Sequence, residues 1–282
     1  MTCQTLPLAH RCVLSLTGPD TLTLLERLVT SRTADWGEGE ARYGALLTPQ
    51  GKVISDFLAL RTSDGVWMDT DRAEAAGLAK RFQMFRLRSE VDIMVRPDLE
   101  VWISTESAPT VPPDTVHAFP DPRHPDSPWR LIRPVTGDTA SAADVAAYHR
   151  HRIRLGLPEQ GSDFHAAEVF PADINMDRLG GLDLKKGCFV GQEVVSRMHR
   201  RGTIRKRTVI LEGKTLEPGL DLVCAERQAG QITSASAPVA LGRLRLDRTG
   251  PGAESLMAGP TTATLIGPEW LAGEQAALAA VP

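Results

Sequence analysis

The chain has few aromatic residues, no long apolar run and no recognisable secretory signal. Phe, Trp and Tyr make up 5% of its 282 residues, so few side chains could stack on single-stranded nucleic acid. No apolar run reaches the roughly 20 residues that a membrane-spanning helix requires. The first residues lack a basic region followed by an apolar run and a small-residue cleavage site. We therefore expect a cytoplasmic protein that binds neither a membrane nor nucleic acid.

The cysteines are too scattered to predict a metal site. They share no C-x-x-C pair, which argues against a zinc ribbon or a self-contained cluster site; they are Cys3, Cys12, Cys188 and Cys224. A metal site whose ligands come together only in the folded protein remains possible. His165 and Glu168 have the spacing of helical metal ligands, but no second pair accompanies them. Reduced thiols in the cytoplasm are the simplest interpretation.

The composition is that of a globular protein whose positive charge is concentrated in one segment. Apolar residues make up 42% and charged residues 24% of the chain, whose length favours two or more domains. The net charge is −3, yet residues 185–207 hold eight Lys or Arg and one acid. Such a segment can hold an anion or attract an acidic partner.

This basic segment begins with a glycine-bounded turn around Cys188, in residues 185–193. Residues 192–198 are predicted to form a helix, with Glu193 in its first turn. The amide N–H groups at the helix N-terminus, together with Lys185 and Lys186, would favour a thiolate at Cys188. The residues alone leave a second interpretation open, in which the cysteine is a small buried apolar residue and the charges form a solvated face.

Two further regions indicate how the chain is organised. Residues 97–134 contain nine of the 20 prolines and are predicted to be a turn-rich connection between two lobes. A capping pattern at Ser141 and Asp144 predicts a helix over residues 142–154. After Arg207, short strand-like runs alternate with Gly and Pro turns, which predicts a small all-β domain, either a barrel or a sandwich.

The sequence of residues 186–198, Lys-Gly-Cys-Phe-Val-Gly-Gln-Glu-Val-Val-Ser-Arg-Met, followed by Arg201 and Gly202, resembles the signature of the YgfZ family. These are folate-binding proteins related to the glycine-cleavage T-protein, and they include a mitochondrial iron–sulfur assembly factor. Blocks at residues 45–57, 152–171 and 230–234 resemble the family in the same order. The resemblance therefore extends over nearly the whole chain.

The resemblance implies the fold and the function. It implies an α+β fold, with a T-protein-like two-lobed folate-binding domain (residues 1–204, second lobe about 41–117) and a small C-terminal β-barrel (residues 205–282). It also implies a folate-dependent factor that supports assembly or repair of iron–sulfur proteins. Its cofactor would be tetrahydrofolate. Its partners would be folate and, transiently, iron–sulfur enzymes or assembly proteins.

In this interpretation Cys188 is the chemically active or partner-contacting group. A single cysteine cannot hold a cluster alone, so any contact with a cluster would be shared with another protein. Lys185 and Lys186 would lower its pKa. Gly187 and Gly191 are expected to shape the turn, and Gln192 and Glu193 to fix its geometry. The cations that follow, including Arg197 and Arg201, would hold the acidic tail of a folate or an acidic partner.

The alternative is a tetrahydrofolate-dependent aminomethyl or one-carbon transferase that uses Asp56. Residues 43–60 predict a β-hairpin, and Asp56 lies in its second strand. The residues favour an outward-facing Asp56 over a carboxylate in a ligand cavity, because unpaired burial is costly. Resemblance counts against the transferase, because the T-protein has two aspartates where this chain has Ser55 and Asp56. An arginine, Arg154, also stands where the T-protein has a glutamate that binds the pterin.

An RNA-binding module that uses the basic segment is a third hypothesis. The low aromatic content and the negative net charge of the whole chain count against it.

Overall fold

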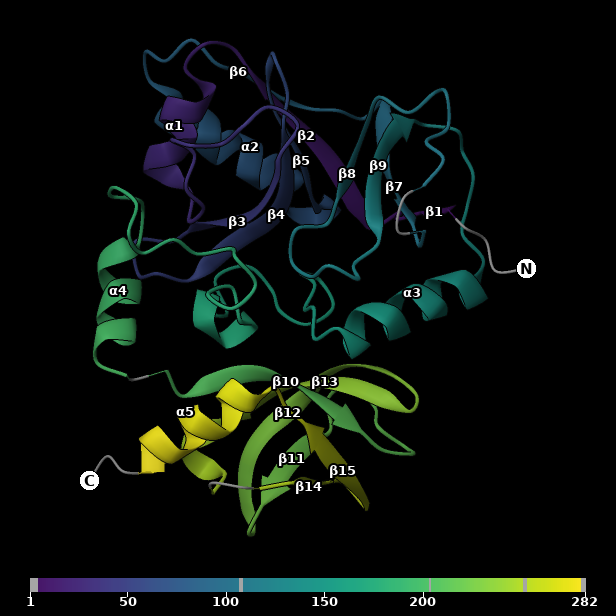
Figure 1. Cartoon of the computed structure of the whole chain (residues 1–282), viewed down its shortest axis with the longest axis vertical. Coiled ribbons are helices and arrows are strands. Elements are labelled where there is room, and N and C mark those ends of the chain that lie inside the picture. Colours follow the sequence, from purple (N-terminus) through teal and green to yellow (C-terminus); the bar gives the residue numbers. More distant parts are fainter. Residues whose placement is uncertain (1–4, 107–108, 203, 251–252, 280–282) are drawn as a thin grey trace. The chain divides into compact units, whose positions relative to one another are not determined.

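A computed structural model describes residues 5–106, 109–202, 204–250 and 253–279 (Figure 1). Contacts divide the chain into two compact units. The first consists of Met1–Asp144, Ala166–Glu168 and Met176–Gln192. The second consists of Val145–His165, Val169–Asn175 and Glu193–Pro282. Each unit is therefore assembled from segments that are distant in sequence.

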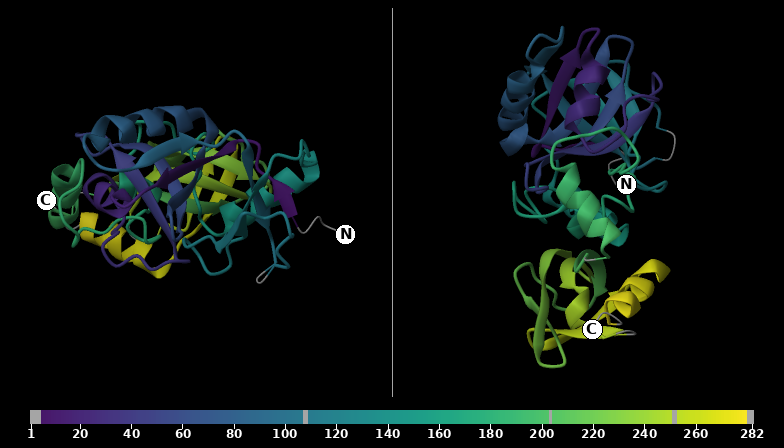
Figure 2. Two further views of the ribbon diagram at one scale, coloured as in Figure 1. Left: turned by 90° about the horizontal axis from the view of Figure 1, so that it is seen from above. Right: turned by 90° about the vertical axis from the view of Figure 1, so that its left-hand side faces the viewer.

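The first unit is built on a five-stranded antiparallel sheet in the order β3-β4-β5-β2-β6. Helix α2 begins at its cap Asp71, whose carboxylate accepts hydrogen bonds from the amides of Ala73 and Glu74. Leucines of α1 and α2 pack with the strands in one core, and Figure 2 shows α2 lying along the sheet. The strands are Ala41–Leu47, Val53–Arg61, Gly65–Asp71, Arg11–Thr17 and Asp92–Val95, and the helices are Thr21–Leu28 and Arg72–Arg86.

A second antiparallel sheet of the first unit has the order β1-β7-β9-β8. Three of its strands come from the proline-rich region, so the expectation of a mere connection there is wrong. The prolines lie at or beyond the strand ends, where a missing N–H disrupts no central ladder bond. The four strands are Thr5–Pro7, Leu99–Ser104, Trp129–Pro134 and His117–Pro120.

The second unit is a closed six-stranded barrel in the order β10-β13-β12-β11-β14-β15, with helices beside it. Gly242 has no room for a side chain, because a Cβ there would lie 2.8 Å from a methyl carbon of Leu222 and 2.9 Å from one of Leu211. The strands are Lys206–Glu212, Val239–Arg245, Arg227–Ser236, Asp221–Cys224, Ser255–Ala258 and Thr261–Ile266.

The helical segments of the second unit include both helices that the sequence predicts. Helix α3 spans Ala142–Arg154 and α4 spans Gln192–Arg200, which confirms the expected positions. Helix α5 packs Leu271 into the barrel core and lies beside the barrel in Figure 2. The remaining segments are η1 (Pro171–Ile174), η2 (Leu246–Arg248) and α5 (Glu269–Ala279).

Candidate functional site

The turn that carries Cys188 is held from within the first unit, and Cys188 itself is exposed. Asp183 anchors the start of the turn. Its carboxylate accepts hydrogen bonds from the backbone N–H groups of Lys185 (2.7 Å) and Lys186 (3.2 Å). Its own N–H donates to the carbonyl of Thr30 at 3.0 Å. The thiol therefore faces solvent from a turn whose backbone is tied down.

Lys186 is buried, and its ammonium points into the first unit. The Nζ atom donates to the carbonyls of Val29 (2.8 Å) and Ser31 (2.7 Å) and lies 3.6 Å from the carboxylate of Glu26. Burial lowers the pKa of Lys186, while the negative charge of Glu26 opposes this shift. The ammonium also lies over the ring of Phe189, 5.5 Å from its centroid. Lys186 thus anchors the turn, and Lys185 is the lysine of the pair with an exposed side chain.

Gly191 brings the turn against the loop between β3 and β4. Its φ angle is +80°, and a Cβ there would lie 2.6 Å from the carbonyl oxygen of Thr48 and 3.0 Å from Cα of Gly51. Only glycine fits such a backbone contact without displacing it. Gly187 differs, because a Cβ there would meet nothing within 4 Å. The structure thus brings together two blocks that lie about 140 residues apart in sequence.

The other predicted residues of the basic segment lie on and after α4. Glu193 and Arg197 form an ion pair of 2.6 Å one helical turn apart, and both side chains are largely exposed. The N–H of Gln192 donates to the carbonyl of Phe189 at 3.2 Å, which links the turn to the helix. Arg201 is exposed and follows the last helical residue.

Asp56 is buried, so the expectation of an outward-facing aspartate is wrong. It is 3% exposed and accepts a 3.0 Å hydrogen bond from the hydroxyl of Tyr43. Every residue of β4 except its last, Arg61, is buried. A strand covered on both faces has no solvent side, and strand alternation cannot reveal this. Burial, with the charge of Asp56, raises the pKa of the Tyr43 hydroxyl well above its usual value.

Tyr43 also joins Asp56 to a buried series of charges. The guanidinium of Arg123 lies 5.4 Å from the centre of its ring and forms a 2.7 Å ion pair with Asp121. Asp121 in turn lies 3.3 Å from Arg130, which lies 3.5 Å from Asp69. Burial alone would raise the pKa of Asp121, but the charges of Arg123 and Arg130 outweigh it and lower that pKa to about 2.

The series ends at Arg11 of β2, which pairs with Asp69 of β5 at 2.6 Å. Because Arg130 belongs to β9, the charges connect the two sheets of the first unit. We define this set as the buried charge series: Asp56, Tyr43, Arg123, Asp121, Arg130, Asp69 and Arg11. The sequence analysis identified only Asp56 among these residues. A signal for Tyr43 was available, since the hairpin register places Ala45 opposite Asp56 and Tyr43 diagonal to it.

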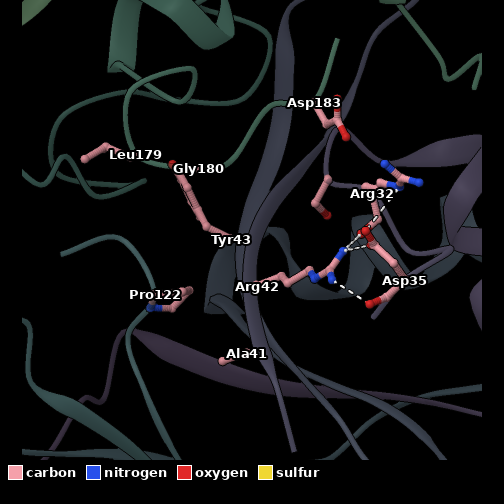
Figure 3. A pocket seen from close by; sticks show the side chains of 10 residues that line it. Arg32, Asp35, Ala41, Arg42, Tyr43, Pro122, Leu179, Gly180 and Asp183 are labelled. Atoms are coloured by element: carbon pink, nitrogen blue, oxygen red, sulfur yellow. Dashed lines mark hydrogen bonds and ion pairs between the residues drawn. The ribbon is translucent and has the colours of Figure 1, made fainter. Parts of the chain in front are cut away.

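A polar cavity of about 330 Å³ opens between Tyr43 and the irregular segment, residues 179–183, that leads to the Cys188 turn (Figure 3). Leu179 and Gly180 lie on one side of it, and Arg32, Asp35 and Arg42 lie on the other. Arg42 is fixed by hydrogen bonds to the carboxylate of Asp35 (2.9 Å) and the carbonyl of Arg32 (2.5 Å). Asp183, which anchors the Cys188 turn, also lines the cavity. The cavity therefore offers charged groups of both signs to a polar molecule.

Within the described residues, no three or more His, Cys, Asp and Glu side chains are grouped so that they could hold a metal ion. No helix in the described part of the chain is both long and apolar enough to cross a membrane.

The fold matches that of a solved aminomethyltransferase. The structure of the glycine cleavage system aminomethyltransferase T from Bartonella henselae superposes with a TM-score of 0.72, at 15% identity, over 95% of this chain and 85% of that one. Residues 205–273 match the family model of the CAF17 C-terminal β-barrel domain. The protein therefore has a T-protein-like α+β fold followed by a six-stranded β-barrel, which confirms the predicted fold class.

Sequence comparison relates the chain to iron–sulfur cluster assembly factors named IBA57. A homologue from Mycosarcoma maydis is 33% identical over 72% of this chain and 55% of its own length. The mouse protein is 26% identical over 83% of this chain and 75% of its own, and the human protein is 28% identical over 70% and 63%. The chain spans about half the length of the fungal relatives that it matches. The C-terminal barrel is thus similar to that of CAF17, and most of the chain is similar in sequence to proteins named IBA57.

The expectation of a cytoplasmic location is wrong, because these curated relatives are named as mitochondrial proteins. Neither the reduced cysteines nor the composition of the first residues distinguishes a cytoplasmic from a mitochondrial protein.

Proposed function

We propose that this chain is a folate-binding factor of the YgfZ type that supports the assembly or repair of iron–sulfur proteins, with Cys188 as the group that meets the partner. The observation that carries the proposal is an exposed thiol on a turn held by the buried ammonium of Lys186 and the close backbone contact of Gly191. The printed names of the IBA57 relatives support the iron–sulfur role.

The geometry of the turn supports a shared contact rather than a resident cluster. A thiolate is a ligand that iron–sulfur clusters use, but one cysteine leaves the other coordination positions to another protein. A turn whose backbone is fixed presents the sulfur to a partner without a large loss of conformational entropy on binding. The partners proposed are therefore iron–sulfur enzymes or assembly proteins that meet Cys188 transiently.

Tetrahydrofolate is proposed as the cofactor on the strength of the T-protein-like fold. The residues of the first unit fit such a molecule in one respect. The buried carboxylate of Asp56, beside Tyr43, is an acceptor of the kind that N–H groups of a pterin ring require. When bound, the folate would supply one-carbon chemistry.

The test is complementation of a strain that lacks its own factor of this type, scored on the activity of its iron–sulfur enzymes. Cys188→Ser is expected to abolish rescue while leaving the thermal unfolding temperature and folate binding unchanged. Cys224→Ser, which alters a partly buried thiol at the end of β11, is the matched control and is expected to rescue fully. Full rescue by Cys188→Ser would refute the role of this thiol.

The transferase alternative is favoured by the burial of Asp56 and its bond to Tyr43, because burial can tune a carboxylate for work at a folate nitrogen. It makes the opposite prediction. A transferase would retain activity in Cys188→Ser and lose it in Asp56→Asn, as measured by release of a one-carbon unit to tetrahydrofolate. The outcome for Cys188→Ser therefore separates the two functions.

A further inference from the structure

The outer surface of the barrel carries a second concentration of positive charge, distinct from the Cys188 turn. A hollow of about 370 Å³ is lined by residues of β10, β12, β13 and η2. We call it the barrel hollow. Four of its lining residues are cations, and none of the lining residues that the structure describes is acidic. The polar members are Lys206, Gln228, Gln231, Arg243, Arg245 and Arg248.

The strand register explains why these charges meet. Lys206 of β10 pairs with Arg245 of β13, and Gln231 of β12 pairs with Arg243 of β13. Leu244 alternates with the two arginines and is fully buried, so the arginines share the outer face. Gly230 also lines the hollow and, having no side chain, contributes only backbone to it.

The arrangement is unfavourable for the barrel by itself. Like charges directly opposite on neighbouring strands destabilise a sheet, and Lys206 lies directly opposite Arg245. Asp247 compensates part of this charge, since its two carboxylate oxygens accept bonds from Arg245 at 3.1 and 2.7 Å. Lys206 and Arg248 are both exposed, so their positive charges are accessible to an anion.

Two of the cations are already positioned by the protein. The bidentate bond to Asp247 fixes Arg245, and Arg248 donates to the carbonyl of Gln228 at 2.7 Å. Side chains that are held before binding lose less entropy on binding. Guanidinium groups bind carboxylates with two parallel hydrogen bonds. The side-chain amides of Gln228 and Gln231 are held beside them by bonds to the carboxylate of Asp221 (2.8 Å) and the carbonyl of Gly219 (3.1 Å). These groups suit an array of carboxylates.

We propose that the barrel hollow binds an acidic segment of a partner protein, in which two or more Asp or Glu side chains lie close together. Its cations span adjacent strands, about 4.8 Å apart, so they can meet separate carboxylates rather than one small anion. The described lining contains no aromatic residue on which a nucleobase could stack, which favours a peptide over nucleic acid. The site does not depend on Cys188, on folate or on the proposed function.

The test measures fluorescence anisotropy of a labelled six-residue peptide of alternating Glu and Asp, titrated with the full chain at low ionic strength. Replacing Lys206 and Arg248 together by Gln is expected to raise the Kd about tenfold or more. A matched double variant, Lys214→Gln with Arg227→Gln, removes the same charge from exposed barrel positions outside the hollow. It is expected to change the Kd less than twofold. All four side chains are exposed, so the unfolding temperature of both variants should match that of the unaltered chain.

Three results would overturn the proposal. The first is an unchanged Kd in the hollow variant. The second is an equal loss in the matched variant, which would mean that only overall charge matters. The third is tighter binding through Lys206 and Arg248 of another probe, either a six-nucleotide oligouridylate or a γ-linked triglutamate. Those probes stand for nucleic acid and for the tail of a folate, respectively.

Discussion

Lys185 and Lys186 are neighbours in the chain, but the structure gives them opposite environments. Lys185 is exposed, whereas the ammonium of Lys186 is enclosed by two backbone carbonyls and Glu26. By sequence the two lysines are alike, and both are predicted to act on Cys188 as cations. Which lysine turns inward depends on the acceptors that lie beneath the turn, and those come from residues 26–31.

Replacement of Lys186 by Met should therefore destabilise the protein. The carbonyls of Val29 and Ser31 would lose their donor, and the partly buried Glu26 would lose its counter-charge. We expect the free energy of unfolding in urea to fall by about 2–4 kcal/mol. Lys185→Met, the matched control, should change it by less than about 0.5 kcal/mol. Equal effects of the two variants would contradict the anchoring role.

Gly191 and Gly187 offer a second matched pair. Gly191→Ala places a methyl group 2.6 Å from a backbone oxygen at a positive φ angle, so the turn must move away from the β3–β4 loop. We expect loss of the iron–sulfur rescue together with a lower unfolding temperature. Gly187→Ala enters open space and should retain both. A fully active Gly191→Ala variant would show that the position of the turn is unimportant.

At the scale of single elements, the helices whose ends are marked by local sequence patterns were predictable. The cap at Asp71, the helix over residues 142–154 and the helix after the Cys188 turn all follow from capping residues and helical spacing. The strand Ser255–Ala258 was missed, because four residues with two buried side chains give too short a pattern. The proline-rich strands were missed because proline masks the strand signal.

Helix α3 is tied to the barrel by one buried carboxylate. Asp163 accepts bonds from Arg152 of α3 (2.6 Å) and from the hydroxyls of Thr233 and Ser234 of β12 (both 2.6 Å). Asp163→Ala should lower the free energy of unfolding by about 3–5 kcal/mol, because Arg152 would keep a buried charge with less compensation. Asp221→Ala, at an exposed barrel position, is the control and should have little effect. A small loss in Asp163→Ala would mean that this helix is held mainly by apolar packing.

At the scale of the whole molecule, the buried charge series makes stability depend on pH. The pKa of Asp121 is about 2 in the folded protein and 3.8 in its ordinary state. A lowered pKa contributes stability above pH 4, and this contribution is lost as the pH falls toward 2. This lowering of the pKa of Asp121 corresponds to a contribution of about 2 kcal/mol to the free energy of unfolding.

The measurement is urea unfolding of the unaltered chain and of Asp121→Asn between pH 5 and pH 2. The variant should start less stable, and its free energy of unfolding should fall by about 2 kcal/mol less across this interval. If the free energies of unfolding of both proteins fall in parallel, Asp121 is not the source of the pH dependence.

The sequence alone determined the two main helices of the second unit and a C-terminal all-β domain, because these depend on patterns between residues close in the chain. It determined the class of fold, and the barrel within it, through the resemblance of its motifs to a known family. Only the tertiary structure decided that Asp56 is buried beside Tyr43, that Lys186 faces inward and that Gly191 touches the β3–β4 loop. It also decided that β10, β13 and η2 bring the cations of the barrel hollow together. The reason is that burial and pairing depend on what covers each face, and those covering residues lie tens to more than a hundred positions away.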